Sequence, residues 1–393
     1  MSATSVHVRW GALDLTFSAP QHEVARWLTA HFHTAPEADR EDGHRVEVPH
    51  REDVRITAVV DGSLVDRIVA DARSAGTRQV EGHVGEFWLV GESDGCPVWC
   101  HGLVSDDRVD PADLASGRHV IVATGPGAWL VAGHTAAELS VATVRFTREL
   151  IRLAHAQRGF LTLHAATATR PRHGGLLVLG ASGSGKSTLA LALAQDGGHL
   201  VSGDQTEVVA GGGGVVGVGF PWVARIGAGT LTGLGMAQAV ISASLLRAQP
   251  AVHETAFRPE ATTVGSPLKV ELTMEELDVL LGVRPVDRAR VHGIVVLERS
   301  SDGEAHHCVE TDIDSVWSTM CAELREPDPA FASFWLVPPG ARQPAARTTD
   351  ELRRALHGLR VFRMTWAPDR DDLHAVLRSL DHALDGAARE VRS

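Results

Sequence analysis

The chain contains almost no lysine and no tyrosine. Of its 37 basic residues, Lys186 and Lys269 are the two lysines, and the remaining 35 are arginine. Only four of the 393 residues are cysteine, which excludes a disulfide framework as the source of stability. A chain of this length that is 44% hydrophobic can bury a sizeable core without disulfides or metals. We therefore ask what each lysine does that arginine could not do in its place.

Positive charge and long apolar runs are also scarce. The net charge of −12 argues against an extended nucleic-acid surface and favours a small anionic ligand that is bound locally. No stretch approaches the roughly 18 uncharged apolar residues of a membrane span, and the nearest one, residues 120–133, contains Gly and Pro. Residues 1–17 lack the apolar core of a signal peptide. These features predict a cytoplasmic protein that binds neither a membrane nor nucleic acid.

The length predicts two or three domains of about 150 residues each. Residues 1–150 combine strand-like and helical stretches without a catalytic motif, and predict a separate N-terminal α+β domain for substrate or partner recognition. Residues 151–385 predict a mixed α/β catalytic domain, followed by a tail at 386–393. Two Pro-containing stretches, 249–267 and 326–348, are expected to be long loops, either lids or plain surface insertions.

Residues 180–188 match the phosphate-binding pattern G-x-x-x-x-G-K-[ST]. An apolar run at 176–179, expected to be a strand, precedes the pattern, and a helical run at 188–195 follows it. The glycines allow close backbone approach, and successive N–H groups at a helix start then form a cradle for phosphate oxygens. The residues of this loop are Gly180, Ala181, Ser182, Gly183, Ser184, Gly185, Lys186, Ser187 and Thr188.

Within this loop, Lys186 would place a compact ammonium group against the outer phosphates, and Ser187 would ligate Mg²⁺. Arginine is a planar fork and could not replace that point charge in a cramped loop. This explains why a chain with two lysines has one of them here. The alternative is a glycine-rich turn between strand and helix that binds nothing.

Two polar residues flank the loop. His164 ends an apolar strand before the loop. After the loop, residues 200–209 predict a strand that is interrupted near Gly203, and Asp204 lies at the end of its first part, residues 199–204. The carboxyl ends of strands in an open α/β sheet gather at the ligand crevice, so Asp204 could ligate Mg²⁺ or accept a proton from an attacking hydroxyl. The alternatives are that Asp204 is a turn residue beside Gly203 and that His164 is structural.

These segments resemble a known family. The stretch Leu163-His164-Ala165-Ala166, the loop and residues 199–209 are similar to the C-terminal catalytic domain of HPr kinase/phosphorylase. That family has a His-containing strand, a P-loop and an acidic element after a short helix, and is related in fold to ATP-dependent phosphoenolpyruvate carboxykinase. The resemblance covers roughly residues 160–384, with its strong part at 161–209.

The resemblance implies an ATP- and Mg²⁺-dependent kinase with a hydroxyl acceptor. The loop amides and Lys186 would bind the phosphates of ATP, and Ser187 and Asp204 would hold Mg²⁺. Asp204 would be the general base, and His164 would line the site and help to place a phosphate or carboxylate. The acceptor would be a Ser of a peptide or protein, or a small hydroxy compound, because the first domain does not match the N-terminal domain of the family.

The sequence departs from the family at two places. The family has two adjacent Asp residues where this chain has Gly203 before Asp204, which leaves open whether phosphorylase activity remains. The family's Glu-Ile-Arg-Gly segment corresponds at best to residues 224–227, so its Glu metal ligand is replaced by Ala224. Glu207 could substitute for it, and Arg225 could bind a phosphate or an acidic substrate or simply lie on the surface.

The leading hypothesis is therefore a kinase, and two others stay open. The missing acidic residues allow a non-catalytic ATP-binding regulatory module, and a P-loop ATPase would need an apolar strand that ends in a metal-binding carboxylate. The oligomeric state also stays open, a homo-oligomer included.

Three weaker patterns complete the list. Cys96 and Cys100 could bind a metal but lack a second pair nearby, so buried thiols are the simpler interpretation. Residues 212–217 fit the dinucleotide pattern G-x-G-x-x-G in letters only, because a strand and not a helix should follow. Lys269 lies in an alternating stretch that predicts a strand.

Overall fold

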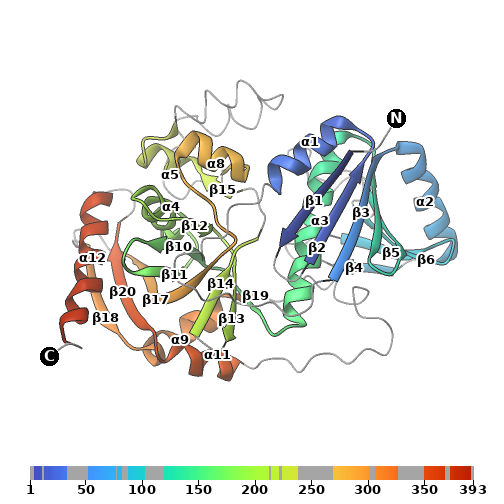
Figure 1. Cartoon of the computed structure of the whole chain (residues 1–393). Coiled ribbons are helices and arrows are strands. Elements are labelled where there is room, and N and C mark those ends of the chain that lie inside the picture. The colour runs from blue at the N-terminus through green and yellow to red at the C-terminus, as the bar shows by residue number, and fades with distance from the viewer. Residues whose placement is uncertain are drawn as a thin grey trace. The chain divides into compact units, whose positions relative to one another are not determined.

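The structure is a computed structural model of the whole chain (Figure 1). It describes residues 4–10, 13–32, 52–76, 78–81, 87–101, 119–211, 214–220, 224–237, 269–300, 306–325, 349–367 and 372–390. These residues form two compact units, which divide between Gly159 and Phe160, and each unit is a mixed sheet with helices packed on it. No helix of the described residues is long and apolar enough to cross a membrane.

The first unit is built on a sheet of eight strands. Its inner strands β2, β3 and β8 pair in parallel, and the other neighbours pair antiparallel. In sheet order the strands are β1 (Thr4–Trp10), β2 (Leu13–Ala19), β3 (Glu52–Val60), β8 (Ala128–Gly133), β7 (His119–Gly125), β6 (Cys96–His101), β5 (Phe87–Ser93) and β4 (Arg78–Glu81).

Helices cover both faces of this sheet. Helix α2 (Gly62–Ala75) packs Val65 and Ile68 against Val98 and Val120, and α1 (His22–His31) contacts α3 (Ala136–Ala156). The boundary that we expected at residue 150 lies inside α3, because this helix packs on β3 and β8 and belongs as a whole to the first unit.

The second unit is built on a sheet of ten strands. The path of the sheet, in order, is β12 (Leu200–Ser202), β10 (Ala166–Arg170), β11 (Gly174–Gly180), β17 (Arg288–Arg299), β14 (Gly214–Val218), β13 (Thr206–Gly211), β9 (Leu161–Leu163) and β19 (Leu324–Arg325). Strand β20 (Arg360–Trp366) pairs in parallel with β17 and antiparallel with β18 (His307–Thr311). The long strand β17 therefore has β11 and β20 as parallel neighbours (Figure 1).

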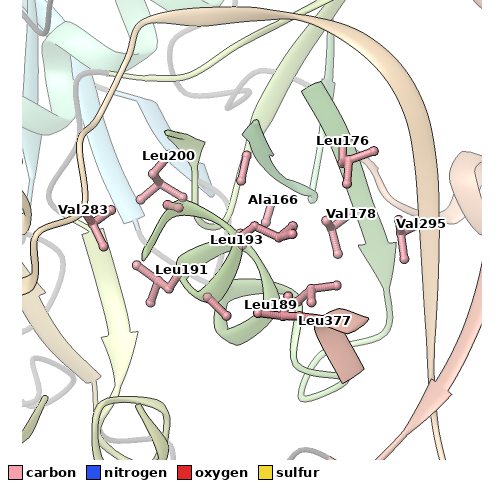
Figure 2. Packing of buried hydrophobic residues seen from close by; sticks show 14 of the residues in the cluster. Ala166, Leu176, Val178, Leu189, Leu191, Leu193, Leu200, Val283, Val295 and Leu377 are labelled. Atoms are coloured by element: carbon pink, nitrogen blue, oxygen red, sulfur yellow. The ribbon is translucent and has the colours of Figure 1, made fainter. Parts of the chain in front are cut away.

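The alternation of apolar residues in β11 decides how this sheet is covered. Leu176 and Val178 lie in one buried cluster, and Leu177 and Leu179 lie in another, because successive side chains of a strand point to opposite faces. Helices α4 (Lys186–Gln195) and α12 (Leu373–Glu390) pack in the first cluster, and α9 (Ile313–Ala322) and α11 (Thr349–Leu356) pack in the second. Figure 2 shows the first cluster, in which Leu193 of α4 lies near Ala166 of β10, Leu189 lies near Leu377 of α12, and Leu191 lies near Val283.

Four smaller elements complete the described part of the second unit: β15 (Ala224–Gly227), which pairs with β16 (Lys269–Leu272), and the helices α5 (Ala228–Gly233) and α8 (Met274–Leu281). The mixed α/β class expected for this part of the chain is confirmed. Helix α12 continues to Glu390, so the tail expected from residue 386 is helical as far as that residue, where the sequence Ala-Ala-Arg-Glu favours a helix.

Candidate functional site

The glycine-rich loop joins β11 to α4, as its sequence pattern predicts. Strand β11 ends at Gly180, and α4 begins at Lys186. Gly185 precedes the helix with φ of 96°, in the left-handed region that favours glycine. A Cβ at this position would also lie 2.3 Å from Cζ2 of Trp366. No residue with a side chain could occupy position 185 without moving either the loop or the indole.

Trp366 supports the loop from the end of β20, which pairs with β17 on the side of β17 away from β11. It is the last residue of β20 and is fully buried, and its Nε1 donates a hydrogen bond to the carbonyl oxygen of Ser184 at 2.8 Å. Ser184 N in turn donates to the carbonyl oxygen of Ala181 at 3.1 Å. The loop is thus held from β20 as well as by its own backbone. The sequence contains no local signal for this contact, because 182 residues separate its two partners.

Lys186 is buried at the base of the loop. Its Nζ donates to the carbonyl oxygens of Gly180 at 2.5 Å and Ala181 at 3.2 Å. These two hydrogen bonds hold the ammonium group of Lys186 against the start of the loop, and the N-terminus of α4 adds the positive end of a helix dipole. The geometry therefore concentrates positive potential at the loop, which is what a chain of phosphates requires.

Ser187 and Thr188 face different partners. Ser187 Oγ donates to the carbonyl oxygen of Gly203 at 2.6 Å, which ties the start of α4 to the turn between β12 and β13. Thr188 Oγ1 lies 2.9 Å from Oγ1 of Thr230 in α5 and is therefore engaged in packing α4. The Ser187 contact has the larger consequence, because Asp204 is the next residue after Gly203. It brings a half-exposed carboxylate beside the loop.

His164 lies between two carboxylates. Its Nε2 is 3.3 Å from Oδ1 of Asp204, and its Nδ1 is 2.7 Å from Oε2 of Glu323. The backbone N–H of His164 also donates to the carbonyl oxygen of Glu323 at 2.8 Å. Arg325 Nη2 lies 3.3 Å from Glu323 Oε2 and 3.3 Å from His164 Nδ1.

This arrangement orients the imidazole ring. A carboxylate can only accept hydrogen bonds, so the short contact to Glu323 is one in which an N–H at Nδ1 donates, and it fixes the orientation of the ring. The ring then directs Nε2 at Asp204. Glu323 directly follows α9 and precedes β19, and β19 pairs with β9, which ends one residue before His164. We did not identify Glu323 from the sequence, and its position between a helix and a two-residue strand gives no motif to search for.

A pocket of about 350 Å³ adjoins the loop. Its walls come from the loop, from the end of β17 and from one residue of α9. The residues that line it are Gly180, Ala181, Ser182, Gly183, Ser184, Val296, Leu297, Glu298, Arg299 and Thr319.

Three other residues that the sequence analysis named lie in strands of the second unit, and the side chain of one of them is outside the described residues. Arg225 lies in β15, in register with Glu271 of β16, and its side chain is outside the described residues. Lys269, at the start of β16, is in the strand that its alternation predicts. Glu207 is fully buried in β13, with Oε1 3.5 Å from Thr162 Oγ1, so it is a component of the sheet core.

The two cysteines of β6 are free thiols that pack among apolar side chains. Cys96 and Cys100 belong to β6, and both pack in the cluster beneath α2. Burial raises the pKa of the Cys100 thiol to about 12, which disfavours the thiolate that a metal would need. Across the part of the chain that the structure describes, no group of three or more His, Cys, Asp and Glu side chains is placed to hold a metal.

The residues around the loop fit a nucleoside triphosphate with a divalent cation. The left-handed glycine, the buried ammonium and the helix N-terminus match phosphate. Mg²⁺ prefers oxygen ligands and commonly takes only one or two from the protein beside the phosphates. The hydroxyl of Ser187 and the carboxylate of Asp204 are oxygen donors of this kind.

Comparisons with known proteins add little to this geometry. No protein-family model and no curated protein matches the sequence. Among solved structures, the chain is similar to the HPr(Ser) kinase/phosphatase from Coxiella burnetii, at 13% sequence identity and a TM-score of 0.27, over 59% of this chain and 99% of that one. A likeness this distant supports no inference about activity, so the proposal below depends on the loop and the residues around it.

Proposed function

We propose that this protein is a kinase, which transfers the terminal phosphoryl group of ATP to a hydroxyl acceptor with the help of Mg²⁺. The observation that carries the proposal is the 2.6 Å hydrogen bond from Ser187 Oγ to the carbonyl oxygen of Gly203. It connects the phosphate loop directly to the residue before Asp204. A phosphate-binding element and a candidate base therefore meet at one edge of the sheet.

The loop performs the binding part of the reaction. Its backbone N–H groups and Lys186 would hold the phosphates, and the charge of Lys186 would oppose the negative charge on the transferred group. The loop is supported by Trp366 and by the buried helix α4, so little reorganisation is needed when the phosphates bind. Positioning and charge neutralisation supply most of the acceleration in phosphoryl transfer.

Asp204 performs the proton part of the reaction. We assign it the role of taking the proton from the acceptor hydroxyl, or of holding Mg²⁺ together with Ser187. Nε2 of His164 lies 3.3 Å from Oδ1 of this carboxylate, and we assign His164 to the lining of the site. The bound Mg²⁺ would neutralise charge on the outer phosphates. The acceptor that these residues would serve is a Ser hydroxyl of a peptide or protein, or a small hydroxy compound.

The proposal is tested by a transfer screen with the purified full chain. ATP labelled at the γ-phosphate is incubated with Mg²⁺ and with panels of Ser-containing peptides and small hydroxy acids. Label that appears in an acceptor supports the kinase, and the Lys186→Ala variant is the matched negative control. Label released only as free phosphate would instead identify an ATPase. ATP binding without release or transfer would identify a regulatory nucleotide-binding module.

A further inference from the structure

Strand β17 carries a carboxylate, that of Glu298, one residue before its end, and Glu298 lines the pocket beside the phosphate loop. Residues Ile294 to Leu297 of this strand are apolar and buried, and the next residue, Glu298, has a side chain that is 46% exposed. A buried apolar strand that ends in an exposed carboxylate is the arrangement by which many phosphate-loop proteins hold a metal ion.

The register of the sheet brings Glu298 to the loop. Strands β11 and β17 run parallel, and Gly180, the first residue of the loop, is paired with Leu297. Glu298 is thus the first residue of β17 beyond the point at which β11 becomes the loop. On its other side β17 pairs with β20, where Glu298 is opposite Thr365 and the next residue, Trp366, binds the loop. The end of β17 therefore lies between two strands that both reach the loop (Figure 1).

Glu298 and the loop share one pocket. Glu298 lines the same space of about 350 Å³ as Gly180 and Ala181. The carbonyl oxygens of these two loop residues accept the hydrogen bonds from Lys186 Nζ. Glu298 thus lines the same pocket as the two residues whose carbonyl oxygens hold the ammonium group of Lys186.

A Mg²⁺ ion bound beside the loop would need carboxylate ligands. Position 203 is a glycine and offers no ligand, and Oδ1 of Asp204 already faces His164. From these observations, and resting on the proposed use of Mg²⁺ and ATP, we infer that Glu298 is a ligand of the divalent cation, bound directly or through a water molecule. It completes the oxygen donor set of Ser187 and Asp204.

The ion pair of Glu298 is compatible with this role. Arg363 Nη1 lies 3.3 Å from Glu298 Oε1, and both side chains are exposed to a similar extent. Exposed pairs of this kind stabilise a protein by about 1 kcal/mol or less, so a divalent cation can displace the guanidinium. If Glu298 served only this pair, its loss would leave metal binding unchanged.

The test is the affinity for Mn²⁺, measured with the full chain by electron paramagnetic resonance in the presence of the β,γ-imido analogue of ATP. In Glu298→Gln the Kd for Mn²⁺ should rise by about tenfold or more, the scale seen when a supporting ligand of a metal site is lost. Binding of the analogue without metal should be unchanged. The matched control is Glu310→Gln, because Glu310 is also a strand glutamate paired with an arginine, Arg360, and is 43% exposed. It should bind Mn²⁺ like the wild type.

Arg363→Met provides a second control. It breaks the same ion pair and keeps the carboxylate, so Mn²⁺ affinity should not fall. The inference is overturned if Glu298→Gln binds Mn²⁺ as the wild type does, or if the wild type with the analogue binds none. The first of these results, together with normal phosphoryl transfer, leaves the kinase proposal intact. If Glu298→Gln binds Mn²⁺ more weakly but the wild type transfers no phosphoryl group to any acceptor, the role of Glu298 as a ligand is supported and the kinase proposal is refuted.

Discussion

Trp366 Nε1 donates a hydrogen bond to the carbonyl oxygen of Ser184 at 2.8 Å. The same indole lies where a side chain at position 185 would have to go. A residue at the end of β20 thus supports the loop by a polar contact and excludes every residue but glycine next to it. The conformation of the loop is therefore a property of the whole sheet and not of the nine-residue motif alone.

We expect Trp366→Phe to loosen the loop. The substitution leaves a buried carbonyl without its donor and opens a cavity, so the free energy of unfolding should fall by about 1–3 kcal/mol. Affinity for ATP should fall severalfold. Urea denaturation and calorimetric titration with ATP measure the two effects. Unchanged ATP affinity in a destabilised variant would show that the indole supports only the fold.

Lys186 should tolerate neither Ala nor Arg. Removal of the ammonium group takes one donor from the carbonyl oxygens of Gly180 and Ala181 and leaves the outer phosphates without a counter-charge. A guanidinium keeps the charge, but its planar fork does not fit the same two acceptors. Both variants should lose transfer by at least about a hundredfold. Lys269→Arg, on β16, is the control and should transfer phosphate at the wild-type rate.

Asp204→Asn should separate binding from turnover. The amide occupies the same volume as the carboxylate but cannot take a proton, so kcat should fall by roughly 10²–10⁴-fold while metal-free ATP still binds. Rapid-quench measurement of a single turnover isolates the chemical step. A variant that turns over normally would remove Asp204 from the role of base.

Glu323 should act on His164 and not on ATP. Glu323→Gln keeps an oxygen that can accept from His164 Nδ1, whereas Glu323→Ala removes it. We expect the Gln variant to retain most of kcat and the Ala variant to lose it, with no change in ATP affinity. The ¹⁵N chemical shifts of the imidazole report whether the donating tautomer is kept. Equal losses in both variants, with an unaltered ring signal, would contradict the positioning role.

The thiols of Cys100, which is buried, and Cys308, which is partly buried, should be slow to react. Burial raises the pKa of Cys308 to about 11 and that of Cys100 to about 12, and only the thiolate is nucleophilic. At pH 8 both should react with iodoacetamide at least about a hundredfold more slowly than an ordinary thiol, given an unperturbed pKa of about 8.5. Below pH 11, each increase of one pH unit should raise the alkylation rate of Cys308 about tenfold, because the thiolate fraction rises by the same factor. Mass spectrometry after timed quenching measures these rates. Alkylation of Cys308 at the rate of glutathione would contradict the expectation.

The loop itself was predictable from sequence because its constraints are local. Its glycines, its lysine and the strand and helix on either side lie within a short stretch of chain. The two flanking residues were also found, since strands that bracket a phosphate loop end at the same edge of the sheet. His164 and Asp204 are brought within 3.3 Å of each other, although their roles stay proposals.

The sequence by itself therefore determined the mixed α/β class, the glycine-rich loop between a strand and a helix with its lysine, and two of the polar groups beside it. Only the tertiary structure brought Glu323, Trp366 and Glu298 to the site. Glu323 is 159 residues from His164, and β17 and β20 reach the loop only through the order and register of the sheet. Pairing between distant strands depends on long-range packing, which leaves no spacing in the sequence from which these contacts could be deduced.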